Sequence, residues 1–186
     1  EKVPGTHASG RNAAMIRQVV PQASIAALAR GGAAFVRQLP SDWPVETIFD
    51  QTGSFLLASE KDSAKLKQDS TIALECGVPS EWWPIDRIVE AMPILAGSTA
   101  TGGVWSPTDG VIDIHGLLQG YLAAAAASGA ELKFSSSVRQ IIVRRNKVCA
   151  IQTESEEIVA DVLINAAGAW AQEIGLLAGA AHIPLV

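Results

Sequence analysis

The stretch VLINAAGAW, at Val162–Trp170, constrains the fold more than any other part of the chain. Its first four residues favour an apolar strand, which is typical of a strand buried on both faces of a sheet. Three small residues follow, Ala166, Ala167 and Gly168. A helical pattern then extends to about Ala178. Two explanations fit the small residues. Either the turn from strand to helix is tight, or a second backbone or a cofactor must pass close to it.

The elements before this stretch follow a recognisable order. Asp113 can cap a helix whose apolar residues recur at i, i+3, i+4 and i+7 from Ile114 to Ala125, and Gly129 ends it. Three short strands follow, at residues 138–143, 148–153 and 158–160. This order is a helix, a three-stranded meander, an apolar strand and a second helix. It is typical of a segment that leaves a nucleotide-binding parallel sheet and returns to it. The predicted fold class is therefore α/β with α+β character, a partial Rossmann-like domain that carries a β-meander.

Residues 34–107 have a different pattern, with a hairpin and many aromatic residues in place of alternating strands and helices. A helix begins near Gln22 and ends at Pro40, and the hairpin is expected at 48–57. A surface helix closes at Gly77, and a short helix follows with Asp86 as its N-cap. We therefore expect two interleaved domains. Residues 1–33 and 108–186 form the nucleotide-binding part, and residues 34–107 form part of an antiparallel-sheet substrate domain.

Composition excludes several classes of function. Hydrophobic residues make up 48% of the 186 residues and charged residues only 18%, which favours a packed core over disorder. The net charge of −5 argues against a nucleic-acid partner. No apolar run is long enough to span a bilayer, and the scattered histidines have no metal-ligand spacing. Cys76 and Cys149 form no CxxC motif, so a reducing, cytoplasmic location is the default.

Neither standard phosphate-binding motif occurs in the sequence. A dinucleotide-binding protein is expected to open with a strand, a G-x-G-x-x-G turn and a helix. This chain contains no G-x-G and no Walker A motif, and the glycine cluster at Gly97–Gly103 has the wrong spacing. The sequence alone therefore shows no complete phosphate cradle.

Two ordered segments resemble a known family. PGTHASGRNAAMIRQ, at Pro4–Gln18, is similar to the segment after the second strand of FAD-dependent amino-acid oxidases and dehydrogenases. The region from SPTDGVIDIHGLLQGYL to NAAGAWAQEIGLLAG is similar to the centre of the same D-amino-acid oxidase superfamily, and most of all to its D-arginine-dehydrogenase-like branch. Together they cover nearly the whole chain, although residues 34–95 match loosely.

The resemblance implies FAD as the cofactor and assigns roles to particular residues. The loop that lies along the flavin corresponds to Ser9, Gly10, Arg11, Asn12 and Ala13, where backbone N–H groups can reach oxygen atoms of the cofactor. Val138 corresponds to the residue that holds the adenine. The Ala166-Ala167-Gly168 turn, with Trp170, would line the dinucleotide crevice. The alternatives are a polar loop that caps a helix through Ser9 or Asn12, and an ordinary strand residue at Val138.

The resemblance also implies a function, the oxidation of a C–N bond of an amino acid or related amine by hydride transfer to flavin. Met15 and Arg17 follow the flavin loop and are the candidates to face the substrate, although core packing is the favoured alternative for Met15. No catalytic residue and no metal ligand is assigned. The alternative function is a non-catalytic fragment or binding module with the same fold remnant and no cofactor.

The family's first strand, its G-x-G-x-x-G turn, its ribose-binding acid and its final segments have no counterpart in this sequence. The chain therefore resembles the middle of a flavoenzyme. We expect the isolated chain to be inactive and to bind FAD poorly, and we expect exposed sheet edges to favour self-association.

Overall fold

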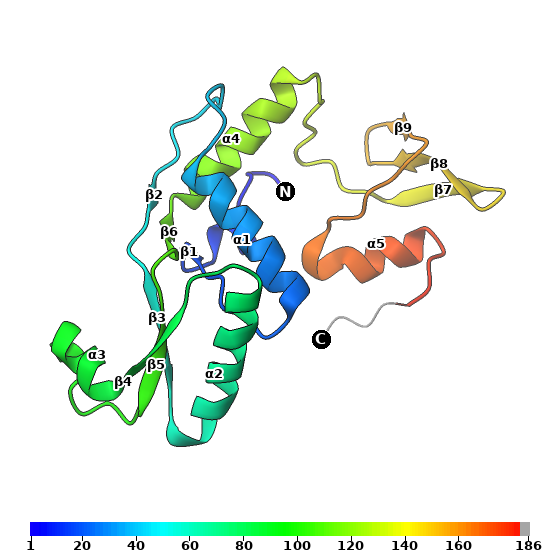
Figure 1. Cartoon of the computed structure of the whole chain (residues 1–186). Helices are drawn as coiled ribbons and strands as arrows, with labels where there is room; N and C mark the ends of the chain where they lie inside the picture. The colour runs from blue at the N-terminus through cyan, green and yellow to red at the C-terminus, as the bar shows by residue number, and fades with distance from the viewer. Residues whose placement is uncertain (183–186) are drawn as a thin grey trace. The chain divides into compact units, whose positions relative to one another are not determined.

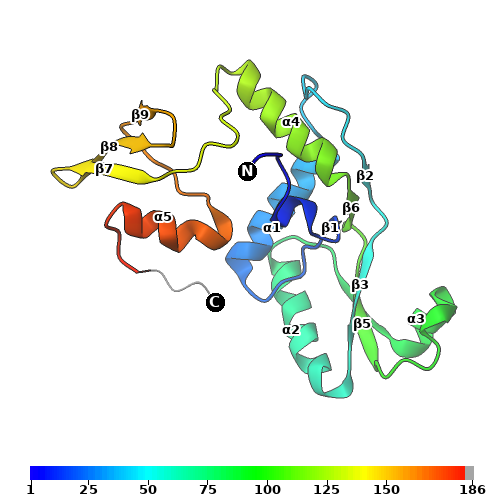
Figure 2. The ribbon, with the colours of Figure 1, turned by 180° about the vertical axis from the view of Figure 1, so that it is seen from behind.

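The computed structural model describes residues 1–182 and divides the chain into two compact units. One unit is Gly5–Ala130, and the other combines Glu1–Pro4 with the described residues from Glu131 onward. This division follows contacts within the chain and does not test the predicted division into an FAD part and a substrate part, which stays a prediction. The helices and strands of the two units are labelled in Figures 1 and 2.

The larger unit contains four helices and six strands among its described residues. Its helices are α1 (Ala23–Arg37), α2 (Glu60–Glu75), α3 (Ile85–Ala91) and α4 (Ile114–Ala127). Its strands are β1 (Met15–Ile16), β2 (Phe49–Asp50), β3 (Ser54–Ala58), β4 (Glu81–Pro84), β5 (Gly102–Ser106) and β6 (Gly110–Ile112). Two 3-10 turns, η1 (Ala8–Gly10) and η2 (Pro93–Leu95), complete it.

The six strands form two antiparallel sheets, ordered β1-β6-β2 and β3-β5-β4. Successive side chains of a strand point to opposite faces, so β5 serves both faces of the second sheet. Val104 packs in the core with Val19, Ala73 of α2 and Val78, whereas a Cβ on Gly103 would lie 3.3 Å from Ile88 of α3. The two helices therefore cover opposite faces, which Figures 1 and 2 also show.

The smaller unit holds the meander β7 (Gln140–Arg144), β8 (Lys147–Gln152) and β9 (Glu157–Val159), followed by η3 (Gly168–Trp170) and α5 (Ala171–Leu177). Its strands pair antiparallel in the order β7-β8-β9, and the left-handed residues Arg145 and Asn146 form the first turn. The predicted three-stranded meander is confirmed.

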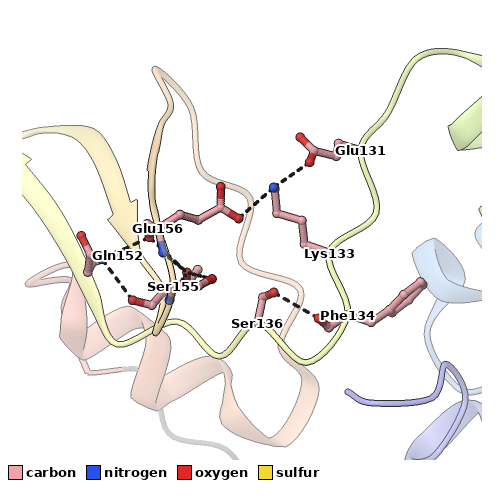
Figure 3. A network of polar contacts seen from close by, with 8 residues as sticks. Glu131, Lys133, Phe134, Ser136, Gln152, Ser155 and Glu156 are labelled. Carbon is pink, nitrogen blue, oxygen red and sulfur yellow. Dashed lines mark hydrogen bonds and ion pairs between the residues drawn. The ribbon is translucent and has the colours of Figure 1, made fainter.

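A polar network fastens the segment before β7 to the turn between β8 and β9 (Figure 3). Lys133 Nζ lies 2.6 Å from Glu131 Oε1 and 2.8 Å from Glu156 Oε1. Hydrogen bonds to Glu131 first, and then to Glu156, raise the pKa of Lys133 above its ordinary value. The ammonium group therefore stays charged throughout the neutral range and can hold both carboxylates.

Several predicted elements are confirmed, and the hairpin at 48–57 is wrong. The helices that were expected to begin near Gln22 and to close at Gly77 are α1 and α2. In contrast, β2 pairs with β6 and β3 pairs with β5, so the two arms of the expected hairpin belong to different sheets. The turn between them contains Gly53 at φ +70, but the chain running from β5 to β6 supplies both arms with partners and separates them. Asp86 is likewise not the N-cap of α3, because Pro84 occupies that position.

The apolar strand predicted at Val162–Asn165 is also wrong for the described structure. This segment has no regular secondary structure, and Val162 is 77% exposed and Ile164 84% exposed. A strand exists only where a neighbour accepts and donates its backbone hydrogen bonds. All strand pairs among the described residues are antiparallel, so the chain offers this segment no parallel partner.

Candidate functional site

The predicted flavin loop is a compact, exposed turn in the larger unit. All five of its residues are exposed: Ser9, Gly10, Arg11, Asn12 and Ala13. A Cβ on Gly10 would lie only 2.0 Å from the carbonyl oxygen of Gly5, so the loop closes on itself at a position that only glycine permits. Asn12 braces the loop, because its Nδ2 donates to the carbonyl oxygens of Ala8 and Ser9 at 3.1 and 2.9 Å. The predicted alternative, a helix cap at Ser9 or Asn12, is wrong, because the N-caps of η1 and α1 are His7 and Gln22.

A groove of about 400 Å³ lies between this loop and α4. Ala8, Ser9 and Asn12 of the loop form one wall, and side chains of α4 form the other, mainly apolar one: Ile114, Leu117, Leu118 and Tyr121. Gly5, at φ +84, lets the loop approach α4, since a Cβ there would lie 3.1 Å from Leu118 Cδ2. Tyr121 was predicted only as part of the apolar face, yet it is 51% exposed. Tyr121 follows Leu117 by four residues, and this spacing predicts that both side chains lie on the same face of α4.

The two predicted substrate residues lie just beyond the loop. Met15 pairs with Val111 of β6 and is 53% exposed, so the alternative of core packing is wrong for Met15. Arg17 lines a second groove of about 340 Å³, whose other wall includes Leu56, Leu57 and, from α2, Asp62, Leu66 and Asp69. This groove therefore combines an apolar surface with charges of both signs.

The remaining predicted cofactor residues lie in the smaller unit. Val138 is half-buried just before β7, and the backbone N–H of the next residue, Arg139, donates to Gln152 O at 2.8 Å. Asn165 shapes the turn after the apolar segment. Its Oδ1 accepts from the backbone N–H of Ala167 at 3.2 Å, and its Nδ2 donates to Ala171 O at 2.7 Å.

The glycine of that turn has a local explanation. Gly168 has φ +55, a conformation that favours glycine, and a Cβ there would meet no described atom within 4 Å. Ala166 is exposed, and Trp170 is 46% exposed. Turn geometry accounts for the glycine, and the open space around it leaves room for a bound molecule.

The predicted site residues therefore fall into two groups. Ser9 to Ala13, Met15 and Arg17 belong to the larger unit, whereas Val138, Ala166, Ala167, Gly168 and Trp170 belong to the smaller one. Within the larger unit, the loop borders the groove on α4 and Arg17 borders the groove on α2. The donor set suits FAD. The loop offers the exposed Ser9 hydroxyl, the exposed Arg11 guanidinium and the backbone N–H groups of Asn12 and Ala13, and its Ser9 and Asn12 face the apolar wall of α4 across the groove. This combination matches a flat ring with polar edges.

Neither a metal site nor a membrane span emerges from residues 1–182. No three His, Cys, Asp or Glu side chains within that range are grouped so that they could hold a metal ion. None of the helices described there has the length and apolar character needed to cross a bilayer.

The family of the chain follows from comparison with known proteins. All 186 residues match the model of the FAD dependent oxidoreductase family named DAO. The chain therefore belongs to this family of FAD-dependent oxidoreductases, and the resemblance inferred from SGRNAA and NAAGAW is confirmed. FAD is the cofactor of the full-length protein.

Curated relatives share short stretches with the chain. Human mitochondrial dimethylglycine dehydrogenase is 33% identical over 101 residues, which are 54% of this chain and 12% of that protein. The D-amino acid dehydrogenase of Vibrio vulnificus is 24% identical over 86% of this chain and 39% of its own length. A mouse mitochondrial protein, the pyruvate dehydrogenase phosphatase regulatory subunit, is 27% identical over 75% of this chain and 16% of its own length. The chain thus spans well under half the length of these relatives.

Solved structures show the same fold. L-proline dehydrogenase from P. horikoshii matches with a TM-score of 0.83 and 23% identity, over 94% of this chain and 46% of that one. Glycine oxidase from Geobacillus kaustophilus matches with a TM-score of 0.80 and 24% identity, over 94% of this chain and 49% of that one. The mixed α/β fold with small antiparallel sheets is therefore that of FAD-binding oxidoreductases, as predicted.

Proposed function

We propose that the full-length protein oxidises the C–N bond of an amino acid or a related amine by hydride transfer to FAD. The observation that carries this proposal is the exposed Ser9–Ala13 loop beside the groove of about 400 Å³ on α4. The names of several relatives support the substrate class, because they are dehydrogenases of dimethylglycine, sarcosine and D-amino acids.

In this proposal the loop holds the flavin end of the cofactor. Backbone N–H groups of Asn12 and Ala13 and the Arg11 guanidinium are donors for its oxygen atoms, whereas the N–H groups of Gly10 and Arg11 donate within the loop to the carbonyl oxygens of His7 and Ala8. Asn12 keeps the loop in shape. Val138 lies along the adenine, and the Ala166-Ala167-Gly168 turn and Trp170 border the dinucleotide. When bound, FAD accepts the hydride. The protein contributes binding and orientation, and no residue of the chain is assigned a proton-transfer role.

Met15 and Arg17 face the substrate in this proposal. Met15 and Arg17 are alternate residues of an extended segment, so their side chains lie on the same side of it. Both are exposed, whereas Gln18, which follows Arg17, is buried. The Arg17 guanidinium can pair with a substrate carboxylate, and the nearby Asp62 and Asp69 suit a positively charged amine. A zwitterionic amino acid with an apolar side chain therefore fits the character of this groove.

Flavin reduction tests the proposed function directly. The FAD-loaded full-length protein is mixed without oxygen with a panel of amino acids and N-methylated amines, and the visible absorbance of the flavin is followed. We expect at least one member of the panel to bleach it. The controls are 2-hydroxy acids and glycerol phosphate. Bleaching by these alone would contradict C–N bond oxidation while leaving the family assignment intact.

The isolated chain is expected to behave differently from the full-length protein. It carries no G-x-G-x-x-G loop, so we propose that it binds FAD poorly and is inactive. The measurement is the visible spectrum of the purified chain after FAD has been added and the free cofactor removed. A retained flavin band would contradict this proposal, since it would show that the segments present in this chain suffice to bind FAD. The cytoplasmic location stays a prediction.

A second candidate function is a non-catalytic, regulatory module. The mouse relative that is 27% identical over 75% of the chain carries the name of a regulatory subunit, which favours this candidate. The flavin-reduction assay described above distinguishes the two candidate functions. A regulatory module leaves the flavin oxidised with every compound of the panel, whereas an enzyme is reduced by its substrate.

A further inference from the structure

Asp109 is fully buried and accepts three hydrogen bonds. The residue directly precedes β6 and is 0% exposed. Its Oδ1 accepts from the backbone N–H of Gln18 at 3.1 Å and from Gln18 Nε2 at 2.9 Å, and its Oδ2 accepts from Ser54 Oγ at 2.7 Å. Its own carbonyl oxygen accepts from the backbone N–H of Gly53 at 3.0 Å. One residue therefore joins three segments that are far apart in the sequence.

This arrangement makes Asp109 costly to remove. A buried carboxylate is tolerated only where donors satisfy it, and hydrogen bonds to a charged group are about twice as strong as neutral ones. Gln18, Ser54 and Asp109 are all buried, so loss of the carboxylate would leave buried donors without an acceptor. Gln18 Nε2 also donates to Thr108 Oγ1 at 2.9 Å, which fixes the orientation of the amide.

The bonds to Gln18 act on the segment that carries the candidate site. Gln18 directly follows Arg17, and β1 is held on β6 by the pairs Met15–Val111 and Ile16–Gly110. Gly110 directly follows Asp109. This short stretch therefore holds β1 through its strand pairing with β6, and holds Gln18 through the side chain of Asp109. The path of residues 9–18 is therefore set at its C-terminal end by Asp109.

We propose that Asp109 is a positioning residue. By holding Gln18 in place, it fixes the segment that presents the Ser9–Ala13 loop, Met15 and Arg17 to cofactor and substrate. Asp109 and Gln18 are not assigned a contact with either molecule, and the proposal rests on the proposed function for the placement of FAD and substrate.

The test compares two substitutions in the full-length protein. Asp109→Ala removes both side-chain acceptors, whereas Asp109→Asn keeps the shape, because its Oδ1 can accept from Gln18 and its Nδ2 can donate to Ser54 Oγ. Hydrogen–deuterium exchange is measured on peptides covering residues 9–18 and on α2 as an internal reference. The Kd for FAD is measured by fluorescence. Asp109→Ser, whose short hydroxyl cannot reach all three donors, replaces Asp109→Ala if that variant does not fold.

We expect Asp109→Ala to raise the exchange rate of residues 9–18 by about tenfold relative to α2, and to weaken FAD binding by about fivefold or more. Asp109→Asn should return both values to within about twofold of the wild type. Equal acceleration in both regions would overturn the proposal, since it would show a general loss of stability. A local acceleration with unchanged FAD binding would overturn it as well. A wild-type protein that binds no FAD contradicts the proposed function instead, and the exchange measurement then still decides whether Asp109 holds the segment.

Discussion

Gly10 is the residue whose identity the loop geometry restricts most tightly. A Cβ there would approach the Gly5 carbonyl oxygen to 2.0 Å, and backbone atoms cannot yield as a flexible side chain can. We expect Gly10→Ala to lower the free energy of unfolding by about 1–3 kcal/mol, as overpacking does. The control is Gly31→Ala in α1, where nothing lies within 4 Å and alanine should stabilise the helix by about 1 kcal/mol. Urea unfolding of both variants checks the prediction, and equal effects would contradict it.

Glu81 should make stability depend on pH. Its carboxylate accepts from Trp83 Nε1 and from Arg87 Nη1, each at 2.7 Å, while the Arg87 guanidinium lies 3.6 Å from the Trp83 ring centroid. The hydrogen bond from Trp83, followed by that from Arg87, lowers the pKa of Glu81 below its ordinary value. A lowered pKa in the folded state means that the stabilisation is present above the unfolded pKa and is lost as pH falls through the folded one.

We therefore expect Glu81→Gln to lower the melting temperature at pH 7, and this difference to shrink as the pH falls below the ordinary carboxyl pKa of 4.5. Melting curves of the two proteins across this range provide the measurement. Trp83→Phe is the companion variant, because it removes the larger of the two causes and should raise the pKa of Glu81. A difference in melting temperature that is constant with pH would show that the carboxylate charge contributes nothing.

Helix α4 carries the apolar wall of the groove, and an N-cap stabilises its first turn. Asp113 Oδ1 accepts from the backbone N–H of Gly116 at 3.0 Å, which confirms the predicted N-cap. We expect Asp113→Ala to lower the free energy of unfolding by about 1 kcal/mol, and Asp113→Asn to lower it much less, since asparagine is a good cap. Chemical denaturation of both variants tests this expectation. An asparagine variant as unstable as the alanine one would contradict the capping role.

Taken as one chain, the protein presents several unpaired strand edges. In the sheet β3-β5-β4 the outer strands have a partner on one side only within residues 1–182, and Leu57 of β3 is 39% exposed. We predict that the isolated chain self-associates through such edges, with a sedimentation coefficient that rises with concentration. Leu57→Lys should reduce association, whereas Leu28→Lys, 76% exposed on α1, should not. A chain that sediments as a monomer at all concentrations would contradict the prediction.

The two aspartates of the β6 region show where sequence reasoning succeeds and where it stops. The role of Asp113 was predictable, because a cap bonds a backbone group three residues away. The role of Asp109 was not, because its partners Gln18 and Ser54 lie 91 and 55 residues away. Nothing in the sequence near Asp109 distinguishes a turn residue from a buried acceptor.

The sequence by itself determined the local elements and the family of this protein. Helical periodicity, caps and glycine stops act over a few residues, so α1, α2, α4 and the meander could be predicted, and SGRNAA with NAAGAW identified an FAD-dependent oxidoreductase. Only the tertiary structure decided which strands pair. It placed β2 and β3 in different sheets, left Val162–Asn165 without a strand partner within residues 1–182, and buried Asp109. The physical reason is that strand pairing and burial depend on neighbours distant in the sequence, which local pattern does not encode.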